Sequence, residues 1–369
     1  MRRFLYTACL SVVLCACTEE VGKPGVPGDP PNDGFGATLE VPVPAEGRVF
    51  VTLDKPEIVT PEGDGSTTTD WDLAFEKYDI FTNSGASGPG EGGAFGPLDA
   101  STYNEGIAPA IPFMTKDESG GAFRDFWAYD PSAHVLWVRY HVFGVRDGDK
   151  HWKVQVLGYY AEQQGAPVPA IYRIRWAEVT SAGVGPTQTL ADLDGTAGGS
   201  QAPEDAPSEC LDLGTGARTK HTPAEALTTQ DWHLCFRRAS IAVNGELGGP
   251  RGVTAVDLHA GETKDESLDG VKTRTDETEL ARFDAVGHTQ ISDPKLVWRG
   301  DRVFSAFTEY WIDREASAPA PTTFSWLAQS AADGFTRYLL VFDRFDGATA
   351  EGPGKVVLRV RPEGIVPQN

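Results

Sequence analysis

Seven histidines and five cysteines are the side chains of this sequence most able to act as bases, nucleophiles or metal ligands. Three of the histidines, His134, His141 and His151, lie in or beside two strand-like runs. Their alternation with apolar neighbours predicts that they occupy an exposed polar face of a sheet. The sequence contains neither G-x-S-x-G nor H-E-x-x-H, the motifs of common hydrolases. We therefore expect a protein that is not an enzyme.

Two further motifs resemble ligand loops but favour a plainer interpretation. The stretch "SGASGPGEGG" (84–93) has no lysine after its glycines and carries Glu91, which would repel a phosphate. We interpret it as a loop in which glycine permits positive φ and close backbone approach. The stretch "DLDG" (192–195) resembles the start of a calcium loop but lacks the glutamate at the twelfth position, which favours a linker.

The N-terminus predicts export and a lipid anchor. Arg2 and Arg3 precede an apolar run that is too short to span a bilayer, as in a signal peptide covering residues 1–16. The sequence Leu14-Cys15-Ala16-Cys17 looks like the lipobox of bacterial lipoproteins, which implies cleavage before Cys17 and lipidation of its thiol. No aspartate follows Cys17, so this resemblance implies the outer membrane of a Gram-negative bacterium. The alternative is an ordinary secretory signal.

Composition narrows the partners. The formal net charge is −21, which argues against binding nucleic acid or an anionic membrane surface by bulk electrostatics. Hydrophobic residues make up 40% of the chain, enough to build cores. A lipid anchor therefore remains the expected membrane contact, and the protein partner stays open.

The sequence contains a long internal repeat, so the strands that position the candidate residues occur twice. Asp70-Trp71 returns as Asp231-Trp232, and the same spacing carries Asn83 to Asn244. A period this long predicts duplication of a whole domain. The expected boundaries are a tether over 17–44, a first domain over 45–179, a linker over 180–208 and a second domain over 209–364.

Alternation of period two predicts an all-β fold with mostly antiparallel strands in both domains. In "DWDLAFEKY", Trp71, Leu73 and Phe75 share one face. The runs "HVLWVRYHV" and "HWKVQVLGYY" flank "RDGD" and form a predicted hairpin. A three-residue loop or a bulge is expected there, because a two-residue loop would oppose the apolar residues of one run to Lys153 and Gln155 of the other.

Four stretches together resemble the HmuY family of bacterial lipoproteins. They are "WDLAFEKYDIFTNSGASGPGEGGAF", "FWAYDP", "DGDKHWKVQVLGYY" and "IYRIRW", in that order, and the match covers about residues 45–178. A weaker copy covers about 209–364. The founding member of the family is a surface-exposed lipoprotein with an all-β fold that holds haem iron between two histidines. The resemblance therefore implies haem, or a related tetrapyrrole, as a ligand.

The same resemblance supplies candidate haem ligands. The family's ligand positions fall in residues 96–133, which contain no histidine here. By those positions Met114 and Tyr129 become the first candidates, with His134 in reserve, and tyrosine is a known haem ligand. An aromatic wall of Phe123, Phe126 and Trp127 is expected to receive the ring. The alternative for Met114 is that it fills a gap in a core.

Two cysteines remain after the signal and lipid cysteines are set aside. Cys210 and Cys235 are an even pair in an oxidising compartment, and we expect a disulfide between them. At the repeat spacing they take the places of Val49 and Ala74, on two strands expected to be neighbours. His233 lies beside Cys235, but two cysteines and one histidine lack the fourth ligand that a structural zinc site needs.

Two hypotheses for function follow. The first is a ligand-binding lipoprotein of the outer membrane that takes haem or a related tetrapyrrole. The second is a non-haem recognition or structural module that reuses the same fold.

Overall fold

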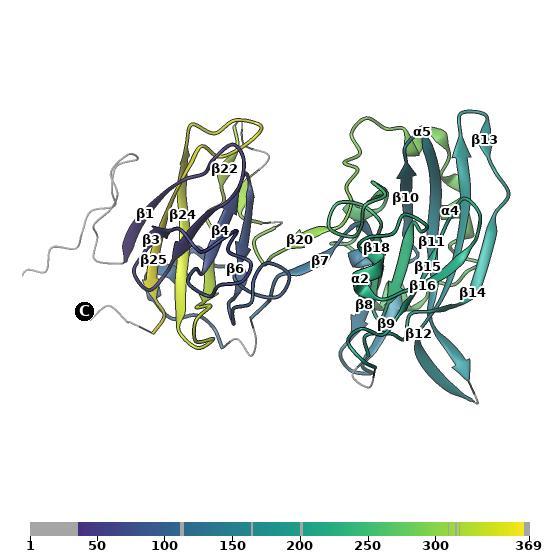
Figure 1. Ribbon diagram of the computed structural model, residues 1–369, viewed down its shortest axis with the longest axis horizontal. Helices are drawn as coiled ribbons and strands as arrows, with labels where there is room; N and C mark the ends of the chain where they lie inside the picture. Colours follow the sequence, from purple (N-terminus) through teal and green to yellow (C-terminus); the bar gives the residue numbers. More distant parts are fainter. Residues whose placement is uncertain are drawn as a thin grey trace, which may run out of the picture.

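The computed structural model describes residues 36–110, 114–163, 165–199, 202–308, 310–313, 316 and 318–364. Within these residues the fold is all-β, as predicted, with antiparallel sheets and only short helices. Two lobes are joined by a narrow ribbon of two strands (Figure 1). No helix in the described part of the chain is both long enough and apolar enough to cross a membrane.

The terminal lobe packs two sheets around a shared core. The five-stranded sheet has the order β1 (Ala37–Pro42), β25 (Lys355–Pro362), β24 (Arg337–Asp346), β23 (Ser325–Gln329) and β6 (Gly93–Leu98). The four-stranded sheet has the order β3 (Glu57–Val59), β2 (Val49–Thr52), β4 (Leu73–Glu76) and β5 (Asp79–Thr82). Leu73 and Phe75 are buried between the sheets against Trp326 and Leu340, so the expected apolar face of "DWDLAFEKY" does build a core. This lobe also contains α1 (Ala100–Glu105), β21 (Ile312–Asp313) and β22 (Ala320–Pro321).

The central lobe repeats this plan. Its larger sheet has the order β13 (Gly183–Val184), β12 (Ala166–Thr180), β11 (Lys150–Gln163), β10 (Val142–Asp147) and β19 (Thr254–Asp257), with β14 (Gln188–Asp194) also paired to β12. Its second sheet has the order β16 (Arg218–His221), β15 (Ser208–Leu211), β17 (Leu234–Arg237) and β18 (Ser240–Val243). A separate hairpin is formed by β8 (Trp127–Asp130) and β9 (Val135–Val138).

Short helices cover the central lobe. They are η1 (Ala122–Asp125), α2 (Pro223–Ala226), η2 (Ala260–Glu262), α3 (Leu268–Lys272), α4 (Leu280–Ala285) and α5 (His288–Ile291). Phe283 of α4 and Ile291 of α5 pack on Val142, Ala177 and Val179 of the large sheet. The large sheet is therefore buried on both faces.

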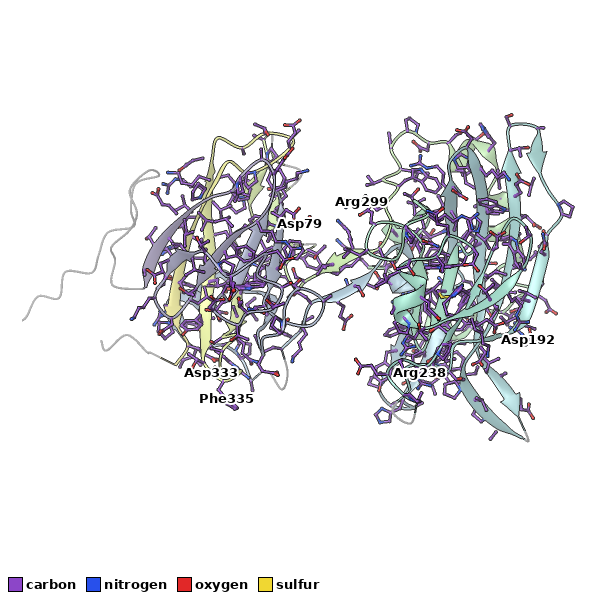
Figure 2. The ribbon with its side chains drawn as sticks, in the orientation of Figure 1. Asp79, Asp192, Arg238, Arg299, Asp333 and Phe335 are labelled. Carbon is purple, nitrogen blue, oxygen red and sulfur yellow. A yellow bond between two sulfur atoms is a disulfide. The ribbon has the colours of Figure 1, made fainter. Side chains whose placement is uncertain are left out.

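The crossover ribbon consists of β7 (Glu118–Gly120) and β20 (Arg302–Phe304), which pair antiparallel between the lobes. The ring of Phe304 lies between the guanidinium groups of Arg124 and Arg302, with each carbon 4.8 Å from the ring centre. Asp79 of the terminal lobe and Arg299 of the central lobe lie on the facing sides of the two lobes (Figure 2). The ribbon is thus the place where the chain passes from one lobe to the other, twice.

Each lobe combines halves of both repeats. We name the first half of repeat 1 (residues 37–117), its second half (121–180), the first half of repeat 2 (188–301) and its second half (305–362). In the terminal lobe β1 and β6, from the first repeat, pair with β25 and β23 from the second. In the central lobe β14 and β19, from the second repeat, pair with β12 and β10 from the first. The two repeats have exchanged their second halves.

This exchange corrects the expected domain boundaries. Neither of the two largest sheets is confined to residues 45–179 or to 209–364, because β24 and β25 complete the sheet begun by β1 and β6, and β19 joins the sheet of β10 to β13. The expected linker at 180–208 contains β13 and β14, both hydrogen-bonded to β12. The expected tether at 17–44 ends earlier, since β1 begins at Ala37. The duplication stays a prediction from the repeated spacing, and that spacing cannot tell which half pairs with which.

The hairpin register also differs from the expectation. Asp147 opposes Lys150, so the loop holds two residues, and Val142 opposes Gln155. The prediction of a longer loop assumed one unbroken strand from Leu136 to Val145. The chain instead breaks at Tyr140, whose φ of 57° lies in the left-handed region. That break lets Phe143 and Val145 face the core with Trp152 and Val154.

Candidate functional site

The β8–β9 hairpin brings two of the three candidate ligands together. The hydroxyl of Tyr129 and Nδ1 of His134 share a hydrogen bond of 2.7 Å. The turn between the strands is held by Asp130, whose Oδ1 accepts from the backbone N–H of Ser132 at 3.0 Å and from its hydroxyl at 2.6 Å. His134 has a φ of 56°, a turn conformation that returns its ring toward Tyr129. Tyr129 is 47% exposed, so its oxygen can meet a ligand from solvent.

The rest of this hairpin face is anchored to the core. Trp127, Leu136 and Val138 are partly buried against the central core, as is Tyr160 of β11. Trp127 Nε1 donates to the Ala239 carbonyl at 3.3 Å, and the Leu136 N–H donates to the Tyr160 hydroxyl at 3.0 Å. These contacts hold the hairpin in place, and Tyr129 lies at its exposed end. A ligand there would meet a positioned phenol.

The other face of the hairpin is closed by α3. Lys272 of α3 forms an ion pair with the buried Asp130 and lies over the ring of Trp137, 6.0 Å from its centre. The hydrogen bonds from Lys272 and Ser132 lower the pKa of Asp130. These contacts fix the hairpin from behind and leave the Tyr129 face open.

The expected aromatic wall is only partly present. Phe123 and Phe126 are fully buried, with Phe123 stacked on Phe143 at 4.3 Å between ring centres and Phe126 close to Tyr159 and Tyr172. These rings fill the core because the large sheet closes over them. Of the three expected rings, Trp127 alone is partly exposed. The prediction that Phe123 and Phe126 receive a flat ligand does not fit this packing.

Met114 lies in the other lobe. It packs against a small cluster of the terminal lobe that includes Leu98, Tyr103 and Leu339. This is the gap-filling role that was the alternative interpretation. The structure therefore separates Met114 from Tyr129 and His134, and the three do not form one ligand set.

His141 is not on an exposed face, contrary to the expectation. It is buried, with Nδ1 2.7 Å from Oδ2 of Asp257 and Nε2 3.1 Å from Oε1 of Glu266. Asp257 ends β19, and Glu266 lies in the covering segment that follows, which contains η2 and α3 to α5 and folds over this face of the sheet. Strand alternation does not reveal this covering. His151 is partly exposed and lies edge-on to Trp298, with 5.8 Å between ring centres.

Glu266 is the centre of this buried ionic cluster. Arg139 contacts it at 2.6 Å and Arg274 at 2.5 Å. Burial would raise the pKa of Glu266, but the hydrogen bonds from the two arginines and His141 outweigh burial and hold the pKa at about 2. No group of three or more His, Cys, Asp or Glu side chains is arranged to hold a metal ion in the described ranges. The cluster ties the covering segment to the sheet.

The glycine loops owe their shape to a buried asparagine in each repeat. Asn83 Nδ2 donates to the carbonyls of Thr68 and Trp71 at 2.9 and 3.0 Å, and its Oδ1 accepts from Gly90 N–H at 3.0 Å. Asn244 repeats all three bonds, at 3.0 and 3.1 Å to carbonyls and 3.1 Å from the Arg251 N–H. A Cβ on Gly88 would lie 2.1 Å from Asn83 Oδ1, and one on Gly249 2.2 Å from Asn244 Oδ1. In both loops the glycines allow close approach of the backbone to the asparagine, as predicted, and these contacts are structural.

One matched position carries a different side chain in each lobe. In the terminal lobe Asp72 Oδ2 accepts from the Leu53 N–H at 2.8 Å. In the central lobe His233 Nδ1 accepts from the Leu213 N–H at 3.1 Å. Burial raises the pKa of Asp72, whereas burial and the nearby Arg251 lower the pKa of His233 to about 4. The sequence repeat aligned these residues but gave no sign that they share one role.

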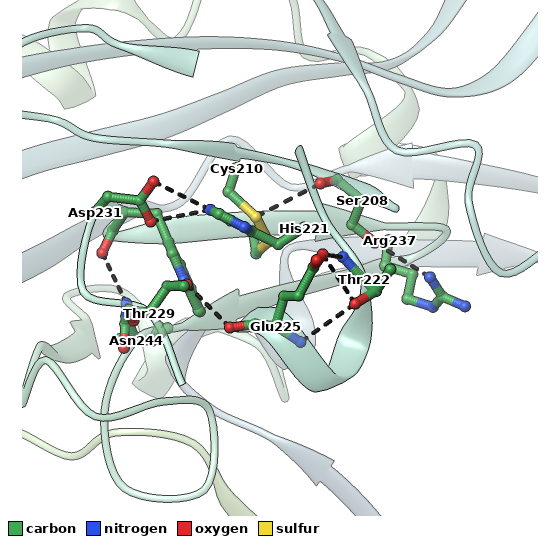
Figure 3. Close-up of a disulfide and its surroundings, with 12 residues drawn as sticks. Ser208, Cys210, His221, Thr222, Glu225, Thr229, Asp231, Arg237 and Asn244 are labelled. Carbon is green, nitrogen blue, oxygen red and sulfur yellow. Dashed lines mark hydrogen bonds and ion pairs between the residues drawn. A yellow bond between two sulfur atoms is a disulfide. The ribbon is translucent and has the colours of Figure 1, made fainter. Parts of the chain in front are cut away.

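The two cysteines form the expected disulfide (Figure 3). Cys210 of β15 and Cys235 of β17 are directly opposed, with Cα atoms 4.0 Å apart. The neighbouring strands were predicted correctly, but the alignment shifts by one residue, because Ala74 opposes Phe50 rather than Val49. His221, nearby on β16, pairs with Asp231 at 2.9 Å.

The remaining candidates lie outside the site. Cys17 and the signal peptide fall outside the described residues. Asp192 and Asp194 of the calcium-like stretch lie on β14, at the outer part of the central lobe (Figure 2). Arg218 and Lys220 pair with these aspartates at 2.8 and 3.2 Å. Their charges are thus neutralised by the neighbouring strand.

No protein-family model matches this chain, and no curated protein matches its sequence significantly. The arguments for function therefore come from the residues and their geometry.

Proposed function

We propose that this chain is a non-enzymatic, HmuY-like lipoprotein of the bacterial outer membrane, and that it binds haem or a related tetrapyrrole at the β8–β9 hairpin. Tyr129 supplies the iron ligand and His134 is its hydrogen-bond partner. The observation that carries this proposal is the 2.7 Å contact between the exposed Tyr129 hydroxyl and His134 Nδ1.

The chemistry of this pair suits ferric iron. When the proton of His134 is on Nε2, Nδ1 accepts the phenol proton and increases the negative character of the Tyr129 oxygen. A phenolate-like oxygen is a ligand that haem iron takes in other proteins. His134 thereby makes the Tyr129 oxygen a stronger iron ligand without contacting the iron itself.

The donor set fits a single-ligand site and does not fit the family's pair of histidines. His141 is buried in ion pairs, and Met114 belongs to the other lobe. Leu136, Trp127 and Tyr160 give the hairpin an apolar base beside Tyr129 on which part of a flat ring could rest. We therefore expect one protein ligand, Tyr129.

The runner-up is a non-haem recognition or structural module. The burial of Phe123 and Phe126 favours it, because the rings expected to line a haem pocket fill a core instead. In that case the exposed Tyr129, on the open face of the hairpin, would contact a macromolecular partner.

A haem titration separates the two proposals. The chain from Thr18 onward, which lacks the proposed lipid site, is titrated with ferric haem and followed by the Soret band. Haem binding predicts a saturable band at one equivalent, lost in Tyr129→Phe and shifted in His134→Ala. Tyr310→Phe, at an exposed tyrosine outside the hairpin, is the matched control and should keep the band. A wild-type protein without a saturable band would refute the haem proposal and leave the recognition module.

The anchor is tested separately. Mass spectrometry of the mature N-terminus should find lipid on Cys17, and Cys17→Ala should give an unprocessed or released protein. An unmodified N-terminus at another residue would contradict the proposed anchor.

A further inference from the structure

We infer that a few residues on the outer faces of the β11–β12 and β24–β25 hairpins decide which first half of a repeat each hairpin joins. Lys153 and Gln155 of β11 select the first half of repeat 2, and Leu339 and Val341 of β24 select the first half of repeat 1. The exchange between repeats is thus specified by complementary side chains. This inference is independent of the proposed ligand.

Lys153 makes contacts that only the central lobe offers. It is 2% exposed, and its Nζ donates to the carbonyls of Phe283 and Val286 at 2.8 Å each. These carbonyls lie at the C-terminal end of α4, where backbone acceptors lack helical partners and attract a cation. The ammonium also lies 4.3 Å from the ring centre of Phe283. The covering segment of repeat 2 is therefore shaped to receive a buried lysine.

Gln155 and Arg175 extend this polar match. Gln155 Nε2 donates to the Tyr140 carbonyl at 2.6 Å, and its Oε1 accepts from Arg175 Nε at 2.7 Å. Arg175 also reaches the carbonyl of Asp276 in the covering segment, at 3.4 Å. Gln155 Nε2 also donates to the Glu279 carbonyl at 3.5 Å. Lys153, Gln155 and Arg175 thus each have a partner in the covering segment.

The terminal lobe has apolar residues at the matched positions. Strand pairing places Leu339 where Lys153 stands and Val341 where Gln155 stands, since both hairpins follow the same register at the repeat spacing. Leu339 and Val341 pack with Leu98, Tyr103 and Ala108 from the first half of repeat 1. The side chains of this cover are apolar where they meet Leu339 and Val341, and the Tyr103 carbonyl beside them already accepts from Arg361 Nη1 at 2.9 Å.

The unexchanged pairing would mismatch both faces. Lys153 would lose the carbonyls of Phe283 and Val286 and be buried against apolar side chains such as Leu98, and burying a charge that has lost its hydrogen bonds is unfavourable. Leu339 would face the carbonyls of Phe283 and Val286 and leave them without a donor. The combination of attractive contacts and penalties against the wrong partner is a general source of specificity.

A steric observation points the same way. Gly90 and Arg251 are matched, because each donates its N–H to the buried asparagine of its loop. A Cβ on Gly90 would lie 2.8 Å from Cβ of Ala331, which belongs to the second half of repeat 2. In the central lobe Arg251 instead reaches Asp147, from repeat 1, at 2.9 Å. Repeat 2's own second half would therefore crowd Arg251.

Two pairs of introduced cysteines report the pairing. Pro42 of β1 opposes Lys355 of β25 in the exchanged chain. Ile171 of β12 occupies the matched place in repeat 1, because it opposes Asp194, the last residue of β14, as Lys355 opposes Pro42, the last residue of β1. Directly opposed residues of antiparallel strands lie within reach of a disulfide. Pro42→Cys with Lys355→Cys therefore detects exchange, and Pro42→Cys with Ile171→Cys detects the unexchanged chain.

Each reporter chain, from Thr18 onward, is refolded from denaturant under oxidising conditions, and cross-linked peptides are quantified by mass spectrometry. With the natural hairpins we expect the Pro42–Lys355 link to dominate by about tenfold or more. The four changes Lys153→Leu, Gln155→Val, Leu339→Lys and Val341→Gln should reverse that ratio. An unchanged preference for the Pro42–Lys355 link would overturn the inference.

Single changes keep the test decisive if the fourfold variant does not fold. Lys153→Leu alone should raise the yield of the Pro42–Ile171 link several-fold, since the hairpin then suits the apolar cover. Lys150→Leu, an exposed change on the same strand, is the matched control and should leave both yields unchanged. No increase for Lys153→Leu, or the loss of both links, would overturn the inference.

Discussion

The terminal and central lobes share one scaffold but differ where they meet the other repeat. Asn83 and Asn244 make the same three hydrogen bonds, so the loop device inside each first half is unchanged. In contrast Lys153 replaces Leu339 at a face between halves of different repeats. The asparagine device inside each first half is the same, whereas the Lys153 and Leu339 positions, which join two halves, differ. The lobes can therefore be perturbed at matched positions.

The Asp72 and His233 positions show the same contrast on a smaller scale. Asp72 reaches across the repeat boundary, with Oδ1 accepting from the Ala331 N–H at 2.8 Å. His233 lies between Asp212 of its own repeat, at 3.2 Å, and Asp147 of the other, at 3.4 Å. Both accept a backbone N–H from within their own half. The shared bond is structural, and the contacts that differ are those across the boundary.

The largest effect is expected from the shared asparagines. Asn83→Ala and Asn244→Ala each remove three buried hydrogen bonds, so we expect a loss of roughly 3–5 kcal/mol in the free energy of unfolding of the lobe concerned. Hydrogen exchange resolved by lobe should show Asn83→Ala loosening the terminal lobe and Asn244→Ala the central lobe. Asn104→Ala, at an exposed residue of α1, is the control. Equal loosening of both lobes by either change would contradict the equivalence.

The second-largest difference in stability between the lobes is expected from the disulfide. Phe50 and Ala74 hold by packing the place that Cys210 and Cys235 hold by a bond. The bond closes a sequence separation of 25 residues, and in the chain-entropy account its loss costs roughly 3 kcal/mol. Reduction should lower the melting temperature of the central lobe alone. Free-thiol labelling of the unreduced, unfolded protein checks the bond, and labelling of both thiols would show that it does not form.

The matched Asp72 and His233 positions should respond to pH with opposite signs. The folded pKa of His233 is lowered to about 4, so its contribution is present above about pH 6.5 and is lost as the pH falls toward 4. The folded pKa of Asp72 is raised, so its contribution is present below about pH 3.8 and is lost as the pH rises.

His233→Asn, which keeps an acceptor for Leu213, isolates the histidine. Relative to wild type, the variant should gain roughly 2 kcal/mol between pH 6.5 and 4.5. The difference between the two proteins is the measured quantity, because Asp301 of the same lobe titrates with the opposite sign. His221→Asn is the control. Identical pH profiles for His233→Asn and wild type would show that His233 does not titrate as described.

The smallest expected effect concerns Asp117 and Asp301, which precede the two strands of the crossover ribbon. Burial raises the pKa of Asp117 to about 6 and that of Asp301 to about 7. Asp117 accepts from Thr82 and Ser87. Asp301 accepts from the Val243 N–H through Oδ2, and its Oδ1 has no hydrogen-bond partner within the structure as described. Stability from these groups is present below about pH 3.8 and is lost as the pH rises through 6 and 7.

Asp301→Asn should therefore stabilise the protein by roughly 1 kcal/mol at pH 8 and have little effect at pH 4. Asp117→Asn should stabilise the protein less than Asp301→Asn, because the Asp117 carboxylate accepts more hydrogen bonds, some of which an amide cannot accept. Urea unfolding at the two pH values measures both variants. A larger gain for Asp117→Asn would reverse this ranking and contradict the assigned hydrogen bonds.

Much of the candidate site was accessible from the sequence. Tyr129 and His134 became candidates through the family resemblance, and the structure brings them together on one hairpin; the cysteines were matched to neighbouring strands. The burial of His141 and Phe126 was not accessible, because the covering segment and the closing sheet come from elsewhere in the chain. Proximity of Met114 to Tyr129 in the sequence was misleading, since β7 crosses to the other lobe between them.

The sequence by itself determined the strands, the duplication, the glycine loops and the cysteine pair. Each of these depends on local alternation, on repeated spacing or on residues that act within one half of a repeat. Only the tertiary structure decided which halves pair, because matched halves offer the same backbone edges to one another. That choice depends on buried contacts such as Lys153 with the Phe283 carbonyl and Leu339 with Leu98, between residues far apart in the chain. Burial penalties for an unpaired charge or carbonyl act only once the halves have met.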